Sequence, residues 1–216
     1  TCTGSMQLDY AEQFTVDYYG EYALITIPED NQARYLLVPE GVGVPKGLDE
    51  DITVLCQPLN NIYLVASASM DMFLSADALS SIRFVGLDED GWYLPGVADA
   101  LRAGELAYAG KYSAPDYELI CSEGCDLTIE NTMIYHNPKA REELVDLGIP
   151  VMVDHSSHES SPLGRMEWVK LYGLLTDHLE QAEQAFAEQE QAFEQLKEVS
   201  TGKTVAFFYV NTNGAA

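Results

Sequence analysis

Side chains that could hold a small ligand lie in short segments, most of which directly follow an apolar run typical of a buried strand. They combine hydroxyl groups, aromatic rings, an amide, imidazoles, thioethers and cations, a mixture that suits an oxygen-rich metal chelate or a flat macrocycle. The candidate ligand contacts are Ser67, Ser69, Met70, Lys111, Tyr112, Asn131, Met133, Tyr135, His136, His155, Ser156 and Arg165.

Several of these candidates also have a structural explanation. Ser67 and Ser69 precede a predicted helix and could cap its first turn instead of touching a ligand. Met70 is of a type found more often in a protein core than at a contact. Tyr112 and Tyr135 are the strongest contact candidates, because an aromatic ring with a hydroxyl can both pack against a ligand and hydrogen-bond to it.

The charge of the chain limits its partners. Only 11 Lys and Arg stand against 35 Asp and Glu, which leaves a formal net charge of −24. Such a surface repels phosphate backbones and anionic lipid head groups, so no nucleic-acid partner is expected. Lys111 is either a solvated cation or a contact for an anionic ligand. Arg165 has two similar explanations, ligand contact or an ion pair with Glu167.

The sequence offers no motif for catalysis. It contains no G-x-G-x-x-G after a predicted strand, no phosphate-binding P-loop and no G-x-S-x-G elbow. The C-x3-C pair of Cys121 and Cys125 lacks the further ligands of a zinc site, although a disulfide between them remains open. Cys56 and Cys121 are expected to be buried thiols. The sequence therefore predicts a binding protein and no enzyme.

The candidate residues need a scaffold, and strands alternating with helices from Ile52 onward would supply it. The predicted strands are Ile52–Cys56, Ile62–Ala66, Ile82–Gly86, Leu127–Ile129 and Val151–Asp154. The predicted helices lie near Met70–Leu79, Val97–Ala103, Pro115–Ser122 and Lys139–Leu147. Unbroken apolar strands alternating with helices predict a doubly wound α/β fold with a mainly parallel sheet.

Other elements flank this predicted lobe. Residues 14–18 and 22–27 surround Gly20-Glu21 and predict a β-hairpin, to which Arg34–Val38 adds a strand. A helix is expected to begin at Ser161-Pro162, with serine as N-cap and proline in the first turn. A second helix is predicted over Asp177–Val199, with Glu180 completing a capping box, and Thr204–Val210 reads as a strand.

Three segments together resemble a known family. They are Gly124-Cys125-Asp126-Leu127-Thr128-Ile129-Glu130-Asn131, the run from Arg141 through Leu147-Gly148-Ile149-Pro150-Val151, and Pro162–Gly173. Their order and spacing, with the strand–helix–strand unit Ile62–Gly86, are similar to the class III extracytoplasmic substrate-binding proteins of iron-siderophore and cobalamin ABC importers. The resemblance implies two Rossmann-like lobes joined by one long helix, with the ligand in the cleft between them.

The resemblance also implies a division of the chain. Residues 1–50 would form a tail and appended hairpin, 51–176 the amino-terminal lobe, 177–199 the interlobe helix and 200–216 the first strand of a truncated second lobe. The ligand would be an iron complex, haem or corrinoid, with no intrinsic cofactor, delivered to an ABC permease in the membrane. A fragment of this kind is expected to hold its ligand weakly, and either to self-associate through its unpaired strand or to fold that strand back onto the lobe.

Further consequences of the resemblance are less direct. Cys2, within Thr1-Cys2-Thr3-Gly4-Ser5, resembles the lipid-bearing residue of a bacterial lipoprotein, which implies an extracytoplasmic protein attached to the membrane by a lipid anchor alone. Relatives that bind zinc or manganese directly suggest an alternative metal site at His136, His155 and His158. The usual permease-docking carboxylate is replaced by Asn137-Pro138-Lys139, which leaves Glu142 or Glu143 as substitutes. A surface adhesion or scaffold module is the remaining alternative.

Overall fold

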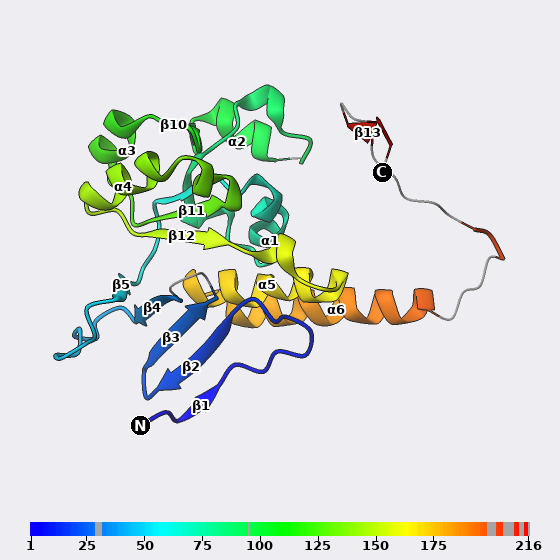
Figure 1. Cartoon of the computed structure of the whole chain (residues 1–216), viewed down its shortest axis with the longest axis horizontal. Helices are drawn as coiled ribbons and strands as arrows, with labels where there is room; N and C mark the ends of the chain where they lie inside the picture. Colours follow the sequence, from blue (N-terminus) through cyan, green and yellow to red (C-terminus); the bar gives the residue numbers. More distant parts are fainter. Residues whose placement is uncertain (29–31, 95, 198–201, 205–209, 212–213, 216) are drawn as a thin grey trace.

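The computed structural model describes residues 1–28, 32–94, 96–197, 202–204, 210–211 and 214–215 (Figure 1). It contains two five-stranded sheets. In spatial order, the amino-terminal sheet consists of β1 (Gly4–Ser5), β2 (Thr15–Tyr19), β3 (Tyr22–Ile27), β4 (Ala33–Val38) and β5 (Ile52–Cys56). The second sheet consists of β12 (Val151–Asp154), β11 (Leu127–Asn131), β6 (Ile62–Leu64), β7 (Ile82–Val85) and β8 (Ala107–Tyr108).

Helices connect and cover these strands. The α-helices are α1 (Met70–Ser75), α2 (Val97–Ala103), α3 (Tyr117–Glu123), α4 (Pro138–Asp146), α5 (Pro162–Leu175) and α6 (Leu179–Lys197). Short 3-10 helices are η1 (Ser67–Ser69), η2 (Leu79–Ser81), η3 (Glu89–Gly91), η4 (Thr132–His136) and η5 (Ser156–His158). Two small ribbons pair β9 (Gly110–Lys111) with β10 (Ala114–Pro115) and β13 (Val210–Asn211) with β14 (Gly214–Ala215).

The amino-terminal sheet is larger than the sequence predicts. β2 and β3 pair antiparallel around Gly20, whose φ of +69° suits a glycine in the turn. β5 pairs in parallel with β4, so the assignment of Ile52–Cys56 to the parallel sheet is wrong. The burial pattern gives the physical reason: β5 is mostly half-exposed, as in an edge strand, whereas every residue of β6 is buried.

All neighbouring strands of the second sheet run in parallel, which confirms the predicted parallel α/β sheet. The chain moves outward from β6 to β7 and β8, and then returns to place β11 and β12 on the other side of β6. The strand order therefore reverses between β6 and β11. In open α/β sheets the crevice that binds ligands lies at such a reversal, beyond the carboxyl ends of the two strands.

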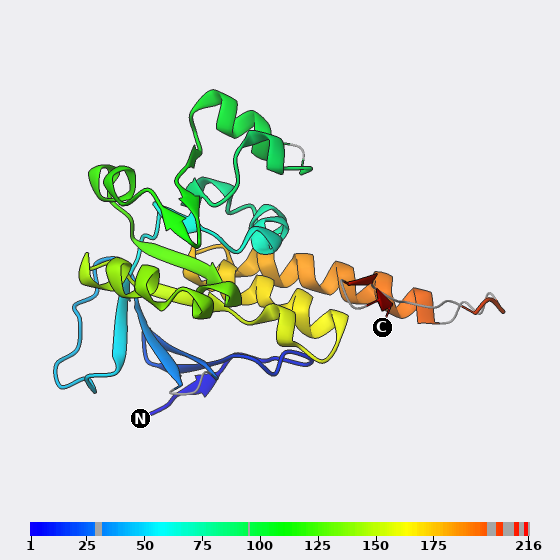
Figure 2. The ribbon, with the colours of Figure 1, turned by 45° about the horizontal axis from the view of Figure 1, so that its top comes forward.

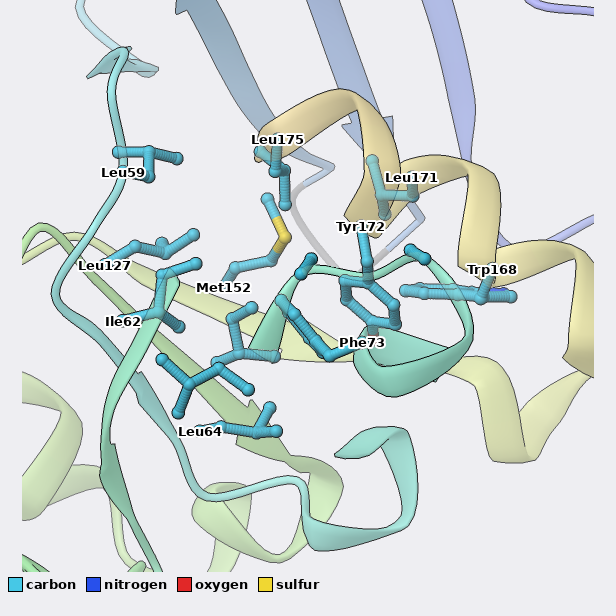
Figure 3. Packing of buried hydrophobic residues seen from close by; sticks show 14 of the residues in the cluster. Leu59, Ile62, Leu64, Phe73, Leu127, Met152, Trp168, Leu171, Tyr172 and Leu175 are labelled. Atoms are coloured by element: carbon cyan, nitrogen blue, oxygen red, sulfur yellow. The ribbon is translucent and has the colours of Figure 1, made fainter. Parts of the chain in front are cut away.

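Successive side chains of β6 enter different cores on the two faces of the sheet. Ile62 and Leu64 pack on one side with α1, α5 and α6 (Figure 3), while Tyr63 and Val65 pack on the other side with α3 and α4. The first of these cores also contains residues of the amino-terminal sheet. In Figures 1 and 2 the α5–α6 pair accordingly lies between the blue strands of that sheet and the green strands of the parallel sheet.

Of the two helices α5 and α6, only α5 begins where the sequence predicts. Ser161 is the N-cap of α5, because its Oγ accepts a hydrogen bond from the Gly164 N–H at 3.0 Å, and Pro162 occupies the first turn. Helix α6 begins at Leu179, so Asp177 lies before the cap position, with a φ of +63°. Its 19 residues extend about 28 Å at 1.5 Å per residue.

Helix α1 is shorter than predicted, and Asp77 gives the reason. Its φ of +57° is in the left-handed region, which ends the helix before η2 begins. The last two residues of the predicted helix 177–199, and the interior of the predicted strand Thr204–Val210, lie outside the described residues. No helix in the described part of the chain is long and apolar enough to cross a membrane.

Candidate functional site

The candidate site is the edge of the parallel sheet where its strands end. Helix η1 follows β6 and η4 follows β11, so these two segments border the crevice at the strand reversal. The β9–β10 ribbon follows β8, and η5 follows β12. The sequence therefore predicts correctly that its candidate residues, except Arg165 on α5, follow the ends of neighbouring parallel strands.

A buried network behind this edge contains two of the predicted contacts, Ser69 and Ser156. The Asp154 carboxylate accepts hydrogen bonds from the Ser69 hydroxyl, from the Tyr172 hydroxyl at 2.5 Å and from the Ser156 N–H at 2.7 Å. Ser69 and Ser156 are only 1% and 3% exposed. They therefore hold η1 and η5 against α5, and the expectation that they face a ligand is wrong.

Burial raises the pKa of the Tyr172 phenol well above its usual value, and the negative charge of Asp154 raises it further. The hydroxyl proton consequently stays on Tyr172, where it can be donated to Asp154. A neutral phenol that donates to a carboxylate makes a strong type of hydrogen bond. These hydrogen bonds link η1 and η5 to α5.

Other predicted contacts are also used internally. Met70 is fully buried in the core, so its expected contact role is wrong. The Asn131 side chain caps η4 by accepting a hydrogen bond from the Met133 N–H at 2.9 Å. His155 is 6% exposed, and its Nε2 lies 2.8 Å from the Tyr135 hydroxyl.

The remaining candidates are accessible, and all except Arg165 of α5 lie at the edge. Lys111, His136 and Arg165 are exposed, and Met133 and Tyr135 are 46% and 41% exposed. Ser67 and Tyr112 are half-buried, and the Tyr112 ring packs on a small cluster of Ile134, Ala140 and Val153. A ligand approaching the crevice would meet these accessible residues first.

A pocket with a volume of about 1130 Å³ lies between the amino-terminal sheet and the β12–α4 region. Tyr135, His155 and His158 line it, whereas Ser67–Met70, Tyr112 and His136 do not. This pocket therefore contains only part of the predicted set of ligand contacts.

Sequence reasoning missed the residues that the amino-terminal sheet brings to this pocket, among them Arg34 and Tyr35. The Tyr35 hydroxyl donates a 2.8 Å hydrogen bond to the Val151 carbonyl at the edge of the parallel sheet. The two residues are 116 positions apart. No local pattern in the sequence indicates this pairing, because it depends on how the two sheets dock.

The alternative metal site is not assembled. His155 and His158 have ring centroids 5.1 Å apart, but no group of three or more His, Cys, Asp or Glu able to hold a metal occurs among the described residues. The set of His136, His155 and His158 therefore does not form a three-ligand site. All four cysteines are free, and Cys56 and Cys121 are exposed, so the expectation of two buried thiols is wrong.

Glu130, which sequence reasoning passed over, is the most unusual polar group near the edge. It is fully buried on β11, and neither carboxylate oxygen has a hydrogen-bond partner among the described residues. Burial raises the pKa of its carboxyl to about 8. A glutamate directly after the predicted buried strand Leu127–Ile129 is the signal that could have indicated it.

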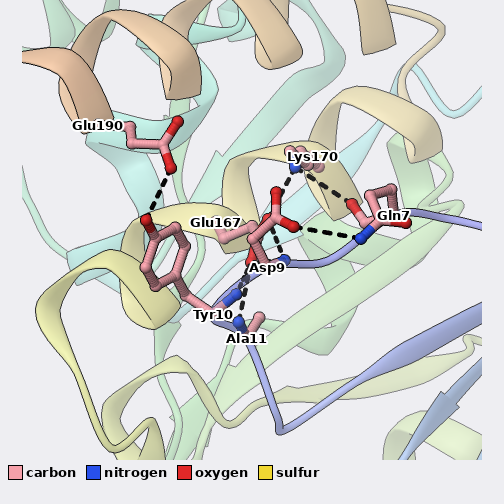
Figure 4. A network of polar contacts seen from close by, with 7 residues as sticks. All are labelled: Gln7, Asp9, Tyr10, Ala11, Glu167, Lys170 and Glu190. Carbon is pink, nitrogen blue, oxygen red and sulfur yellow. Dashed lines mark hydrogen bonds and ion pairs between the residues drawn. The ribbon is translucent and has the colours of Figure 1, made fainter.

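Glu167 ties the amino-terminal segment to α5 (Figure 4). Its fully buried carboxylate accepts hydrogen bonds from the backbone N–H groups of Asp9, Tyr10 and Ala11 and pairs with Lys170 at 2.7 Å. Burial by itself would raise the pKa of this carboxyl, but the hydrogen bonds together lower it. The suggested ion pair between Arg165 and Glu167 is therefore replaced by a pair with Lys170.

Comparison with known proteins identifies related folds. No family model matches the chain. An uncharacterized lipoprotein of Methanocaldococcus jannaschii is 22% identical over 205 residues, which cover 83% of this chain and 48% of that protein. The chain thus spans about half the length of this curated relative.

Solved structures of three binding proteins share the fold. The siderophore-binding protein BauB, bound to two acinetobactin molecules and ferric iron, matches with a TM-score of 0.53 and 16% identity over 70% of this chain and 52% of its own. The periplasmic heme-binding protein HutB of Vibrio cholerae matches with a TM-score of 0.53 and 19% identity over 66% of this chain and 51% of its own. The vitamin B12-binding protein BtuF of Vibrio cholerae matches with a TM-score of 0.52 and 17% identity over 72% of this chain and 57% of its own.

Proposed function

We propose that this chain, whose fold is that of half of a class III periplasmic substrate-binding protein, is the amino-terminal lobe of an extracytoplasmic receptor for an ABC importer. The observation that supports this most strongly is the similarity to three solved binding proteins, each over about half of its length. In the proposal a second lobe closes over the strand ends, and the receptor delivers its ligand to a membrane permease.

The proposed ligand is an iron complex, either a siderophore chelate or haem, or a corrinoid. The accessible candidates Lys111, Tyr112, Tyr135 and His136 offer a cation, two aromatic hydroxyls and an imidazole. Lys111 forms no ion pair with another described residue, so its charge is available to an anionic group of the ligand. Aromatic rings beside a cation suit a large, flat or chelated ligand.

A receptor for a bare zinc or manganese ion is less well supported, because such ions need three or four clustered ligands and the described residues offer none. A catalytic role gains no support either, since the solved proteins of similar fold are named as binding proteins. Binding followed by release to a permease is therefore the function that we propose.

The proposal also assigns the two ends of the described chain. Helix α6 would be the interlobe helix, and residues 200–216 would open the second lobe. The curated relative is a lipoprotein, which supports extracytoplasmic localisation and a lipid anchor at the exposed Cys2.

A visible absorption spectrum of the protein purified from its native host tests this proposal. A co-purified ferric chelate, haem or corrinoid would each give a distinct set of bands, and removal of the ligand should abolish them. A colourless protein that gains no band after incubation with any of the three ligands would contradict the proposal. Mass spectrometry of the same sample separately tests whether Cys2 carries lipid.

A further inference from the structure

A second pocket, distinct from the one beside β12, lies between α1, α5 and α6 and has a volume of about 320 Å³. Its inner wall is apolar: Val169 and Phe186 are each 4% exposed, and half-buried Met72 and Met166 lie beside them. Ala185 of α6 contributes only a methyl group to the lining, which leaves the space open. Apolar walls with two thioethers suit an aromatic or branched hydrocarbon group.

Two opposite charges line the same pocket. Arg165 lies in the first turns of α5 and Asp71 in the first turn of α1, and both side chains are exposed. Neither forms an ion pair with another residue in the described ranges. The guanidinium can therefore bind a carboxylate with two parallel hydrogen bonds, and the dipole of α5 adds to its positive potential.

Asp71 restricts which acids can bind. A second negative charge on the ligand would be repelled by this carboxylate, whereas a neutral or cationic group would be accepted. The volume corresponds to roughly ten water molecules at about 30 Å³ each, enough for one ring with a short acidic chain but not for a macrocycle. The pocket thus combines a size limit, an apolar wall and a preference for a single negative charge.

We propose that this pocket binds a small organic monoanion with a compact aromatic or branched apolar group. Its walls come entirely from the described lobe and α6, so binding does not require a second lobe. This goes beyond the proposed capture of a metal complex at the strand ends, because the pocket is too small for such a ligand.

Isothermal titration of the chain with 3-phenylpropionate, its neutral amide and the dianion glutarate tests the proposal. We expect saturable binding of 3-phenylpropionate with a Kd of about 1 mM or lower, about tenfold weaker binding of the amide, and no binding of glutarate. In Arg165→Gln the acid should bind as weakly as the amide, whereas Lys46→Gln, which removes an exposed cation elsewhere, should change nothing.

A matched pair of variants on α6 tests the location. Ala185→Phe fills the pocket and should abolish binding of 3-phenylpropionate, whereas Ala187→Phe places the same ring on the exposed side of the helix and should not. Equal binding by both variants, or no saturable binding by the unaltered chain, would overturn the proposal. If Ala185→Phe still binds a metal complex, the loss of this pocket leaves the proposed function at the strand ends intact, so the two proposals are tested separately.

Discussion

Glu130 combines complete burial with the absence of any hydrogen-bond partner among the described residues. It faces the same side of the sheet as Tyr63 of β6 and the α3 residue Tyr117, whose pKa values are both raised, largely by burial and in part by the Glu130 charge. Burial raises the pKa of the Glu130 carboxyl, and neither neighbouring phenol supplies a positive charge to the ionised form. The neutral acid is therefore the form that the fold accommodates.

This environment predicts how stability depends on pH. The pKa of Glu130 is about 8 in the folded chain and near 4.5 when unfolded, so the folded state binds more protons between these values. The stabilising effect of the neutral form is complete below about pH 4.5 and is lost as pH rises through about 8. Replacing Glu130 with Gln removes this dependence.

Urea unfolding at about pH 5 and pH 8.5 checks the prediction. Between about pH 5 and pH 8 the unaltered chain should lose free energy of unfolding, relative to Glu130→Gln, by about 1.4 kcal/mol per pH unit. Glu118→Gln, on the exposed surface of α3, is the control and should follow the unaltered chain. Parallel pH profiles for Glu130→Gln and the unaltered chain would show that the carboxyl is ionised in the fold.

Glu167 differs from Glu130, because Lys170 and three backbone N–H groups stabilise its ionised carboxylate. Glu167→Gln removes the charge that pairs with Lys170 and weakens the acceptors of three backbone N–H groups. We expect it to lower the free energy of unfolding by about 3 kcal/mol, as for other buried pairs that lose one partner.

Glu190→Gln serves as the comparison for Glu167→Gln in the same urea experiment. It weakens one hydrogen bond, from the Tyr10 hydroxyl at 2.7 Å, and should lower the free energy of unfolding by about 1 kcal/mol or less. Equal losses in the two variants would mean that the amino-terminal segment is not anchored mainly by Glu167.

Single residues also show why sequence reasoning located the edge but not its contacts. The position of a residue after a strand predicts that Ser69, Ser156 and Tyr135 all lie near the strand ends. It does not distinguish a side chain that turns inward from one that stays accessible. Ser69 and Ser156 are buried because both donate hydrogen bonds to Asp154. The same carboxylate accepts a hydrogen bond from Tyr172 of α5, which is distant in the sequence.

Among the elements, the α5–α6 pair depends on one glycine. A Cβ on Gly173 would lie 2.4 Å from the Ala182 Cβ and 2.8 Å from the His178 carbonyl oxygen. The close approach of the helices therefore requires a residue without a side chain at this position. Residue Gly43, where an added Cβ meets nothing within 4 Å, provides a matched control.

Gly173→Ala should lower the free energy of unfolding by about 1 to 3 kcal/mol through overpacking, while Gly43→Ala should have little effect. Thermal denaturation followed by circular dichroism measures both. Adding Ala182→Gly to Gly173→Ala should recover part of the loss, because it removes the atom with which the new methyl group collides. A double variant no more stable than Gly173→Ala would place the strain elsewhere.

The elements themselves were largely predictable, because each has a local signal. Ser161 and Pro162 mark the start of α5, and the apolar run at Val151–Asp154 marks β12. β5 was assigned to the wrong sheet because a short strand carries no sequence signal for its partner. Its pairing with β4 follows from packing against the rest of the amino-terminal sheet.

At the scale of the whole molecule, strand order determines where a ligand can bind. The order β12-β11-β6-β7-β8 reverses at β6 and β11, which places η1 and η4 around one crevice. Composition and periodicity predict the parallel sheet but not the order of its strands. The docking of the amino-terminal sheet on β12, through Tyr35 and Val151, had no counterpart in the sequence pattern.

The proposed receptor encloses its ligand between two lobes, and this predicts a large difference in affinity. A nanomolar complex is worth about 12 kcal/mol, so a lobe that supplies half of the contacts would bind more weakly than micromolar. The accessible side chains at the strand ends would leave the other half of the ligand in water. One lobe alone is therefore expected to recognise the ligand without retaining it.

Fluorescence titration of this chain, and of a protein extended by the second lobe, with a ferric siderophore, haem and cobalamin tests whether the ligand is enclosed between two lobes. One of these ligands should bind the two-lobed protein with nanomolar affinity and this chain at least about 1,000-fold more weakly. No binding of any of the three by the two-lobed protein, or equal nanomolar affinity in both proteins, would contradict it.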